Sequence, residues 1–300
     1  MDSGSRFCSA GMTTNNSIAT LLKQFHARKP ARIWSLIVTL YGDAIVPRGG
    51  SLWIGSLIEI MALFRIDAGH VRTAVSRLSS DGWLASAKRG RASFYRLTNR
   101  GEAEFLQATQ RIYTGVPRMR GEMQVALIGP VTHDSAALRG ALKTAGYAAV
   151  SPVIHVGFGA LPPDLAGRSG VFVTTPRPED RRALAGAAFR LDEVSQAYRD
   201  FVAQFSPLAV ALEGKAPDGE DAMVARTLLI HAFRRVVLRD PGLPADLLPP
   251  DWQGDTARAL AARIYEVVVA PSELFLDRTG QNEAGPLPPP GPGFHSRFAS

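Results

Sequence analysis

The feature that most constrains the fold is a change of periodicity within residues 67–98. Four apolar residues recur at the i, i+3, i+4, i+7 spacing of a helix that buries one face, namely Val71, Ala74, Val75 and Leu78. Asp67 precedes this helix as a predicted N-cap, because its carboxylate can accept from the free amides of the first turn. The helix is predicted to run to Asp81 and to stop at Gly82.

The opposite face of this predicted helix carries donors and cations and no acid: His70, Arg72, Thr73, Ser76, Arg77 and Ser80. The next residues, "WLASAKRGRASFYRLT", form two short strand-like runs around a basic turn that contains glycine. This pattern predicts a β-hairpin. Its turn carries Lys88, Arg89 and Arg91, and Tyr95 lies in the second run.

Two further helices are predicted before this segment. The apolar run 31–41 predicts the first and is followed by a Gly- and Pro-containing break, while residues 51–64 predict a mostly buried second helix. A helix over 98–113 follows the hairpin, with Ala103, Leu106 and Ile112 on its apolar side. Three helices and then a hairpin predict a winged helix-turn-helix domain over residues 30–114.

In this type of domain the third helix enters the major groove and the hairpin lies along the backbone or the minor groove. Arg72 and Arg77 can donate bidentate hydrogen bonds to guanine, and Thr73 and Ser76 can contact phosphates or base edges. The three cations of the hairpin turn can neutralise phosphates and release counterions. The alternative interpretation is an ordinary solvated surface.

The distribution of charge favours DNA as the partner. Residues 1–120 contain 17 Lys and Arg against 7 Asp and Glu, whereas residues 121–300 contain 17 against 20. The basic excess therefore belongs to the half of the chain that holds the predicted winged helix. A field of that sign attracts polyanions.

The rest of the chain divides by composition into four further parts. We expect a flexible leader (1–29), a ferredoxin-like α+β middle domain (121–208), a helical C-terminal domain (219–278) and a disordered Pro- and Gly-rich tail (279–300). The fold class predicted for the whole chain is thus multidomain α+β.

Several classes of protein are excluded by what the sequence lacks. No run approaches the roughly 20 apolar residues of a membrane helix, and no secretory signal is evident, so we expect a cytoplasmic location without membrane association. The only cysteine is Cys8, which excludes a disulfide framework. The six histidines are scattered without metal-ligand spacing, so neither a metal nor another cofactor is predicted.

Three stretches of the N-terminal part carry a family resemblance: "PRGGSLWIGSLIEI", "VRTAVSRLSSDGWL" and "GRASFYRLTNRG". They resemble the PaaX-like family of bacterial repressors of phenylacetate degradation. The segment that begins "LLIHAFRRVVLRDPGLPADLLPPDW" resembles the C-terminal block of the same family, so the similarity spans residues 32–277. By this resemblance Arg72, Thr73 and Arg77 are recognition-helix candidates, and residues 91–95 belong to the wing.

The resemblance implies a homodimeric repressor of an aromatic-acid catabolic operon, of the phenylacetate type. It implies a winged helix, a Cas2-like ferredoxin-fold middle domain and a helical C-terminal domain. It also implies release from the operator when an aryl-CoA thioester such as phenylacetyl-CoA binds. The predicted partners are therefore double-stranded operator DNA, an aryl-CoA effector and a second copy of the chain.

The candidate effector-binding residues lie in and after the segment "HAFRRVVLR": His231, Arg234, Arg235, Arg239 and Trp252. Their cations can meet CoA phosphates, but they can equally form structural salt bridges with Asp240, Asp246 or Asp251. Trp252 can cover an acyl group or act as a packing anchor.

A second class of function remains open at this point, a metal-dependent Cas2-like nuclease or a CoA-handling enzyme. Nucleases of that fold place an acidic metal ligand at the end of their first strand, but the corresponding strand here ends in Ile128, Gly129 and Pro130. The nearest acid, Asp134, is predicted to begin a helix instead. A third possibility is a DNA-binding module without a ligand. The sequence therefore favours a protein without catalytic residues.

Overall fold

The structure, a computed structural model of the 300-residue chain, describes residues 13–27, 33–129, 135–168 and 170–299. It confirms the α+β class, because long helices occur together with small antiparallel sheets. The chain forms two compact units. The larger unit combines residues from 1–115, 200–235 and 255–300, and the smaller unit combines 116–199 and 236–254.

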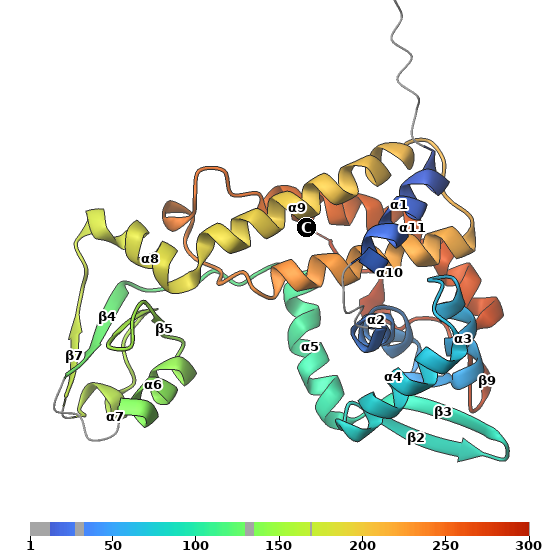
Figure 1. Cartoon of the computed structure of the whole chain (residues 1–300), viewed down its shortest axis with the longest axis horizontal. Coiled ribbons are helices and arrows are strands. Elements are labelled where there is room, and N and C mark those ends of the chain that lie inside the picture. Colours follow the sequence, from blue (N-terminus) through green and yellow to red (C-terminus); the bar gives the residue numbers. More distant parts are fainter. Residues whose placement is uncertain (1–12, 28–32, 130–134, 169, 300) are drawn as a thin grey trace, which may run out of the picture. The chain divides into compact units, whose positions relative to one another are not determined.

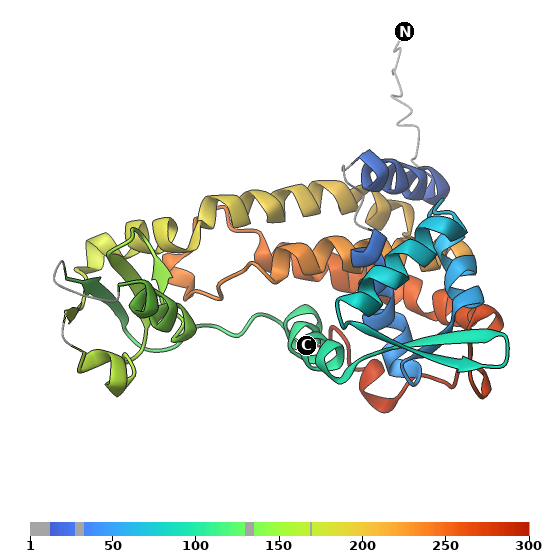
Figure 2. The same ribbon diagram turned by 60° about the horizontal axis from the view of Figure 1, so that its bottom comes forward.

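The first part of the larger unit holds all nine predicted DNA-contacting residues. Its elements are α1 (Thr14–Ala27), α2 (Ile33–Leu40), the π-helical turn η1 (Tyr41–Ile45), the 3-10 turn η2 (Val46–Arg48), β1 (Ser51–Trp53), α3 (Ile54–Ala62), α4 (Ala68–Ser80), β2 (Leu84–Arg89), β3 (Ala92–Leu97) and α5 (Asn99–Tyr113). The strands form a sheet of order β1-β3-β2, and both pairs are antiparallel. Figures 1 and 2 show the hairpin β2–β3 extending beyond the helices, with α4 beside its base.

The predicted third helix is confirmed in its bounds, its cap and its buried face. Helix α4 buries the four predicted residues Val71, Ala74, Val75 and Leu78. Asp67 caps the helix, since its carboxylate accepts a 3.0 Å hydrogen bond from the backbone amide of His70. Gly82 follows the helix with a φ of 72°, in the left-handed region that glycine adopts without strain.

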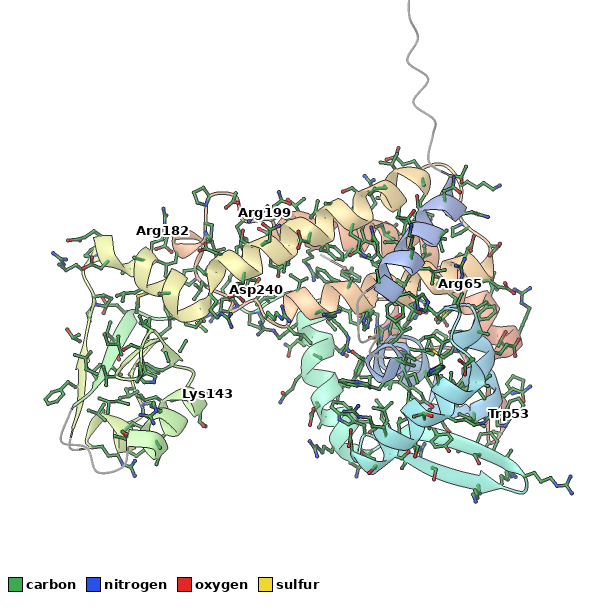
Figure 3. All side chains as sticks on the ribbon, in the orientation of Figure 1. Trp53, Arg65, Lys143, Arg182, Arg199 and Asp240 are labelled. Atoms are coloured by element: carbon green, nitrogen blue, oxygen red, sulfur yellow. The ribbon has the colours of Figure 1, made fainter. Side chains whose placement is uncertain are left out.

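The two helices before α4 differ from the prediction. Residues 51–53, expected within a helix, form β1, because Leu52 is buried opposite Tyr95 of β3. The first helix does not stop at Gly42 but continues through η1 and η2. A side chain at Gly42 would overlap the ring of Phe105, so this glycine permits a close approach of α5. Figure 3 labels Arg65, which has a φ of 58° where the chain turns from α3 toward α4.

Two further predictions in this part are wrong. Residues 14–27, expected in a flexible leader, form α1, because Ile18, Leu21, Leu22 and Phe25 recur at helical spacing and are buried. On α5 the predicted apolar side is rotated. Phe105 and Ile112 are buried, whereas Ala103 and Leu106 are exposed. Residues 1–12, with Cys8, lie outside the described residues.

The rest of the larger unit comes from the C-terminal third of the chain. Its elements are parts of α9 (Leu191–Ala211), α10 (Gly219–Val237) and α11 (Gly254–Thr279), followed by β8 (Gln281–Asn282), β9 (Gly285–Pro286) and the 3-10 turn η5 (Pro292–Phe294). The expectation of a disordered tail over 279–300 is wrong. Leu287 and Phe294 are buried, and Gln281 pairs with Pro286 in a small hairpin.

The smaller unit is built on a four-stranded antiparallel sheet of order β5-β6-β4-β7. Its elements are β4 (Met123–Ile128), α6 (Ser135–Thr144), β5 (Ala148–Ala149), β6 (Ile154–Phe158), α7 (Pro163–Ala166), β7 (Val171–Thr174), η3 (Pro178–Asp180), α8 (Arg181–Phe189) and η4 (Ala245–Leu247), with parts of α9 and α10. Met123 and Val125 of β4 share a core with Leu191, while Ala126 and Ile128 share another with Leu138 of α6. Both faces of the sheet are therefore covered.

An antiparallel sheet flanked by helices agrees with the α+β class expected of this part of the chain. Nothing in the described part of the chain is a helix both long and apolar enough to cross a membrane.

Candidate nucleic-acid interface

The outer face of α4 presents all five of its predicted DNA-contacting side chains to solvent: His70, Arg72, Thr73, Ser76 and Arg77. This exposure follows from the buried stripe, because residues between the buried positions of a helix point away from the core. The hydroxyl of Thr73 donates to the carbonyl oxygen of Gly69 at 3.0 Å, so it is left as an acceptor on this face. The face can therefore approach a duplex without rearrangement of the helix.

The face itself carries no acid, as the sequence indicates, but two acids at the ends of the helix pair with its side chains. The N-cap Asp67 pairs with the ring of His70, and hydrogen bonds from the His70 amide and ring hold the pKa of Asp67 below its usual range. Asp81 lies 3.6 Å from the guanidinium of Arg77, one helical turn away. Both pairs are exposed, and exposed pairs contribute little to stability. The sequence places both acids at the ends of the helix, but their pairing with His70 and Arg77 depends on side-chain positions that the helical pattern does not specify.

Arg72 differs from His70 and Arg77, which each have a carboxylate partner. Its side chain is exposed and, within the described ranges, has no ion pair or hydrogen bond to the rest of the protein. Contact between this guanidinium and a phosphate or a guanine therefore does not require an internal ion pair to be broken first. Arg72 is therefore the strongest single candidate for base contact on α4.

The hairpin places its cations at a two-residue turn. Lys88 pairs with Ser93 and Arg89 with Ala92, which leaves Gly90 and Arg91 between the strands. Gly90 has a φ of 61°, a conformation that glycine adopts without strain. Lys88 and Arg91 are exposed, and neither has an ion pair within the part of the chain that the structure covers.

Arg89 and Tyr95 are less free than predicted. The Arg89 guanidinium donates to the carbonyl oxygen of Glu283, in the small C-terminal hairpin, and the carboxylate of Glu283 accepts from Ser51 of β1 at 2.8 Å. Tyr95 is half-buried, and its carbonyl oxygen accepts from the hydroxyl of Tyr41 at 3.0 Å. The C-terminal segment thus touches the predicted wing, a connection that no local sequence pattern indicates.

A buried ionic network joins the N-terminal helices to the C-terminal segments of the larger unit. Asp43 is 2% exposed and accepts from Arg226 at 2.6 Å, from Arg297 at 2.9 Å and from Tyr265 at 2.9 Å. The hydroxyl of Tyr113 also donates to it. Burial alone would raise the pKa of Asp43, but the two guanidinium groups and the two hydroxyls outweigh it, so the pKa lies below its usual value.

The network continues through α11. Arg226 lies 2.5 Å from one oxygen of Glu273, and Arg48 lies 2.9 Å from the other. Arg48 also pairs with Asp277 and donates to the carbonyl oxygen of Pro288 at 2.8 Å. The sequence prediction missed this network. The available signal was a single carboxylate, Asp43, placed beside a strongly apolar helix.

The candidate effector residues are placed as follows. In the larger unit, the ring of His231 lies 3.1 Å from the hydroxyl of Thr39, and Arg234 donates to the hydroxyl of Ser35 at 2.6 Å. Burial and then the neighbouring Arg235 lower the pKa of Arg234 to about 10. His231 and Arg234 therefore help pack α10 against α2, whereas Arg235 is exposed.

The other two candidates, Arg239 and Trp252, belong to the smaller unit. Arg239 is exposed, and the ring of Trp252 packs edge-on against Tyr198 at 5.3 Å. The three aspartates named as alternative salt-bridge partners have contacts with other residues of the smaller unit. Asp240 accepts a hydrogen bond from Tyr198, Asp246 lies near Arg181 and Asp251 pairs with Arg199. Figure 3 labels Asp240 and Arg199.

The enzyme alternative gains no support from the side chains that are described. Across those residues no group of three or more His, Cys, Asp or Glu is arranged to hold a metal ion. Strand β4 ends at Ile128, as predicted, and Asp134 lies outside the described residues.

Comparisons with known proteins give one family. A model of the PaaX-like protein matches residues 32–101, and a model of the PaaX-like protein C-terminal domain matches residues 189–278. The "Transcriptional repressor PaaX" of Escherichia coli (strain K12) is 34% identical over 291 residues, which cover 88% of this chain and 89% of that protein. A solved structure, "Uncharacterized protein Rv0674 from Mycobacterium tuberculosis", aligns with a TM-score of 0.46 and 21% identity over 88% of this chain and 98% of that chain.

Proposed function

Because the chain belongs to the PaaX-like family, we propose that it is a DNA-binding transcriptional repressor of an aromatic-acid catabolic operon, of the phenylacetate type. The protein acts in the cytoplasm and leaves its operator when an aryl-CoA thioester such as phenylacetyl-CoA binds. The name of the Escherichia coli relative supports repression, and the exposed basic face of α4 and the hairpin supports DNA as the target.

The DNA-binding part is a winged helix-turn-helix within residues 30–114. Helices α2, α3 and α4 precede the hairpin β2–β3, and β1 completes its sheet, which is the element order of that domain. We assign α4 to the major groove and the hairpin to the backbone or minor groove. The assigned DNA-contacting residues are His70, Arg72, Thr73, Ser76, Arg77, Lys88, Arg89, Arg91 and Tyr95.

The single observation that carries this assignment is the exposed Arg72 of α4, which has no ion pair or side-chain hydrogen bond to any described residue, in the same domain as the basic hairpin turn. A guanidinium without an internal partner can make a bidentate contact to guanine, worth about 1–3 kcal/mol of discrimination. Lys88 and Arg91 neutralise phosphates irrespective of sequence, so affinity falls as salt rises.

The middle domain, residues 121–208, is ferredoxin-like. Strands β4, β5, β6 and β7 follow one another with α6 after the first, and the sheet order β5-β6-β4-β7 agrees with that fold. The helical block 219–278 completes the repressor. Two copies of the chain bind a palindromic operator with paired α4 helices, and the effector acts by binding more tightly to an arrangement that does not fit DNA.

A mobility-shift experiment tests this function. The purified protein is mixed with the DNA upstream of its own gene, alone and with phenylacetyl-CoA, acetyl-CoA, CoA and phenylacetate. We expect a specific shift that excess random DNA does not compete away and that an aryl-CoA thioester reverses. Failure to shift this DNA in preference to random DNA would rule out the repressor role, and a shift unaffected by every thioester would rule out the effector.

A further inference from the structure

A cavity of about 410 Å³ lies in the larger unit between α5 and the C-terminal segment. One wall comes from η2 and α5, and the other from residues 291–297. Its principal lining side chains are Pro47, Phe105, Leu106, Tyr113, Phe294 and Arg297. This volume lies within the range of pockets that bind small molecules, which is about 300–1,000 Å³.

The chemistry of these walls selects an uncharged aromatic group. Three aromatic rings, Phe105, Tyr113 and Phe294, offer edges and faces for stacking. The guanidinium of Arg297 is at the wall, but its charge is matched by Asp43 at 2.9 Å. An anionic ligand would therefore compete with a buried carboxylate, whereas a neutral ring would not. Polar groups of Gln110 and Ser296 also line the cavity and can bind a carbonyl group.

One wall of this cavity is joined directly to the predicted recognition helix. Helix α5 begins after Thr98, whose hydroxyl donates to the carbonyl oxygen of Gly82 at 2.7 Å and accepts from the Gly101 amide at 3.1 Å. Gly82 follows the end of α4. A displacement of α5 would therefore be passed to the end of α4 and to the base of the hairpin.

The other wall is joined to the tip of the hairpin. Residues 291–297 continue the segment that carries β8 and β9, and Glu283 between these strands accepts from Arg89. The same segment brings Arg297 to Asp43. A ligand held between the two walls can thus bias both elements that we assign to DNA.

We propose that this cavity binds the aromatic acyl group of the effector. The inference rests on the proposed function for the identity of the ligand, and on the cavity for its place. The ring lies between Phe105 and Phe294, and the CoA portion extends outward past Leu106, which is 64% exposed at the cavity. Tight binding separates α5 from the C-terminal segment and thereby moves the hairpin.

The test is calorimetric titration of phenylacetyl-CoA into the DNA-free, full-length protein and into two matched variants. Leu106→Trp narrows the cavity, and Leu274→Trp makes the same change at an equally exposed leucine, 64% in each case, on α11. We expect Leu106→Trp to weaken binding about tenfold or more and Leu274→Trp to match the wild type. Acetyl-CoA, which lacks the ring, is expected to bind the wild type about tenfold more weakly than phenylacetyl-CoA.

A second cavity variant controls for any effect of Leu106→Trp that does not come from narrowing the cavity. Gly293→Leu also adds bulk at the cavity, and a Cβ added at Gly293 meets no atom within 4 Å, so the side chain starts in open space. Equal affinity of the wild type and both cavity variants, no binding of phenylacetyl-CoA at all, or equal binding of acetyl-CoA would overturn the proposal. Mobility shifts of the same variants without ligand report on the repressor function separately. If the protein binds phenylacetyl-CoA in this cavity but does not bind operator DNA, the repressor function is ruled out and the assignment of the cavity is retained.

Discussion

The two arginines of α4 differ in what they must give up to reach DNA. Arg72 has no partner in the described part of the protein, whereas Arg77 lies 3.6 Å from Asp81. A carboxylate beside a cation both competes for it and repels phosphates. Arg72 and Arg77 therefore differ in how readily they can bind DNA, although they share one helix face. The capping residue Asp81 causes this difference.

Neutralising Asp81 is expected to strengthen DNA binding. Asp81→Asn removes the competitor of Arg77, and an exposed pair is worth about 0.2–1 kcal/mol, so affinity rises up to about fivefold at low salt. Fluorescence anisotropy with a labelled duplex measures the change. Glu104→Gln breaks a comparable exposed pair with Arg100 on α5 and is the control. An Asp81→Asn protein that binds no better than this control would contradict the role of Arg77.

Asp43 is expected to be the most sensitive single residue for stability. Asp43→Asn leaves two buried guanidinium groups, Arg226 and Arg297, without their shared counter-ion. Breaking a buried pair in this way costs about 3–5 kcal/mol. Urea denaturation of the variant and the wild type measures the loss. Asp81→Asn, at an exposed carboxylate, is the control and should cost far less.

The same carboxylate predicts a pH dependence. Its pKa in the folded state is lowered, so its contribution is complete above the unfolded value of about 3.9 and is lost as pH falls through the folded value. The wild type should therefore lose stability in acid below about pH 4, and Asp43→Asn should lose less over the same range. Parallel stability curves for the two proteins between pH 5 and pH 3 would show that Asp43 is not responsible.

At the scale of elements, the C-terminal segment belongs to the folded larger unit rather than to a tail. It contributes the buried side chains Leu287 and Phe294 and supplies Arg297 to Asp43. It also supplies the Glu283 carbonyl to Arg89 of the hairpin. Residues 281–297 therefore connect the core of the larger unit with the element that we assign to DNA.

A chain that ends at Thr279 is expected to be less stable by at least about 3 kcal/mol, because it loses one partner of Asp43 together with buried apolar surface. Thermal unfolding followed by circular dichroism measures this loss. A chain that ends at Phe298 keeps every named contact and serves as the control. Identical midpoints for the two truncated chains would mean that the segment does not support the fold.

The elements that the sequence predicts best are those determined by local pattern. Helix α4, with its cap at Asp67, and the hairpin around Gly90 are predicted because periodicity, capping and turn chemistry agree within a few residues. Strand β1 was mistaken for helix, since its three residues become a strand only by pairing with β3. The order of the tail likewise depends on Asp43, which is far away in sequence.

The candidate site likewise has features that the local sequence pattern predicts and features that depend on distant residues. Exposure of Arg72 and Ser76 follows from the apolar stripe of α4 alone. The acid beside Arg77 and the carbonyl bound by Arg89 depend on the helix end and on a long-range contact, which periodicity does not encode. The cavity beside α5 depends on two segments almost two hundred residues apart in the chain, roughly the separation of Phe105 from Phe294.

At the scale of the whole molecule, the proposal requires that two kinds of contact act together on DNA. In this proposal Arg72 and Arg77 read bases, so the effect of replacing them should depend on the DNA sequence, whereas Lys88 binds phosphate, so the effect of replacing it should not. The proposed dimer would double both contributions on a palindromic operator. The larger unit supplies both kinds of contact, because α4 and the hairpin belong to it.

The most direct measurement of this central claim is the affinity of the wild type, Arg72→Ala and Lys88→Ala for operator and for random DNA across a range of salt concentrations. We expect Arg72→Ala to lose about 1–3 kcal/mol on the operator and little on random DNA. Lys88→Ala should weaken both and reduce the salt slope by about one unit for each copy of the chain bound. Equal losses on both duplexes for the two variants, or none for either, would contradict base reading by α4 and with it the account of the interface.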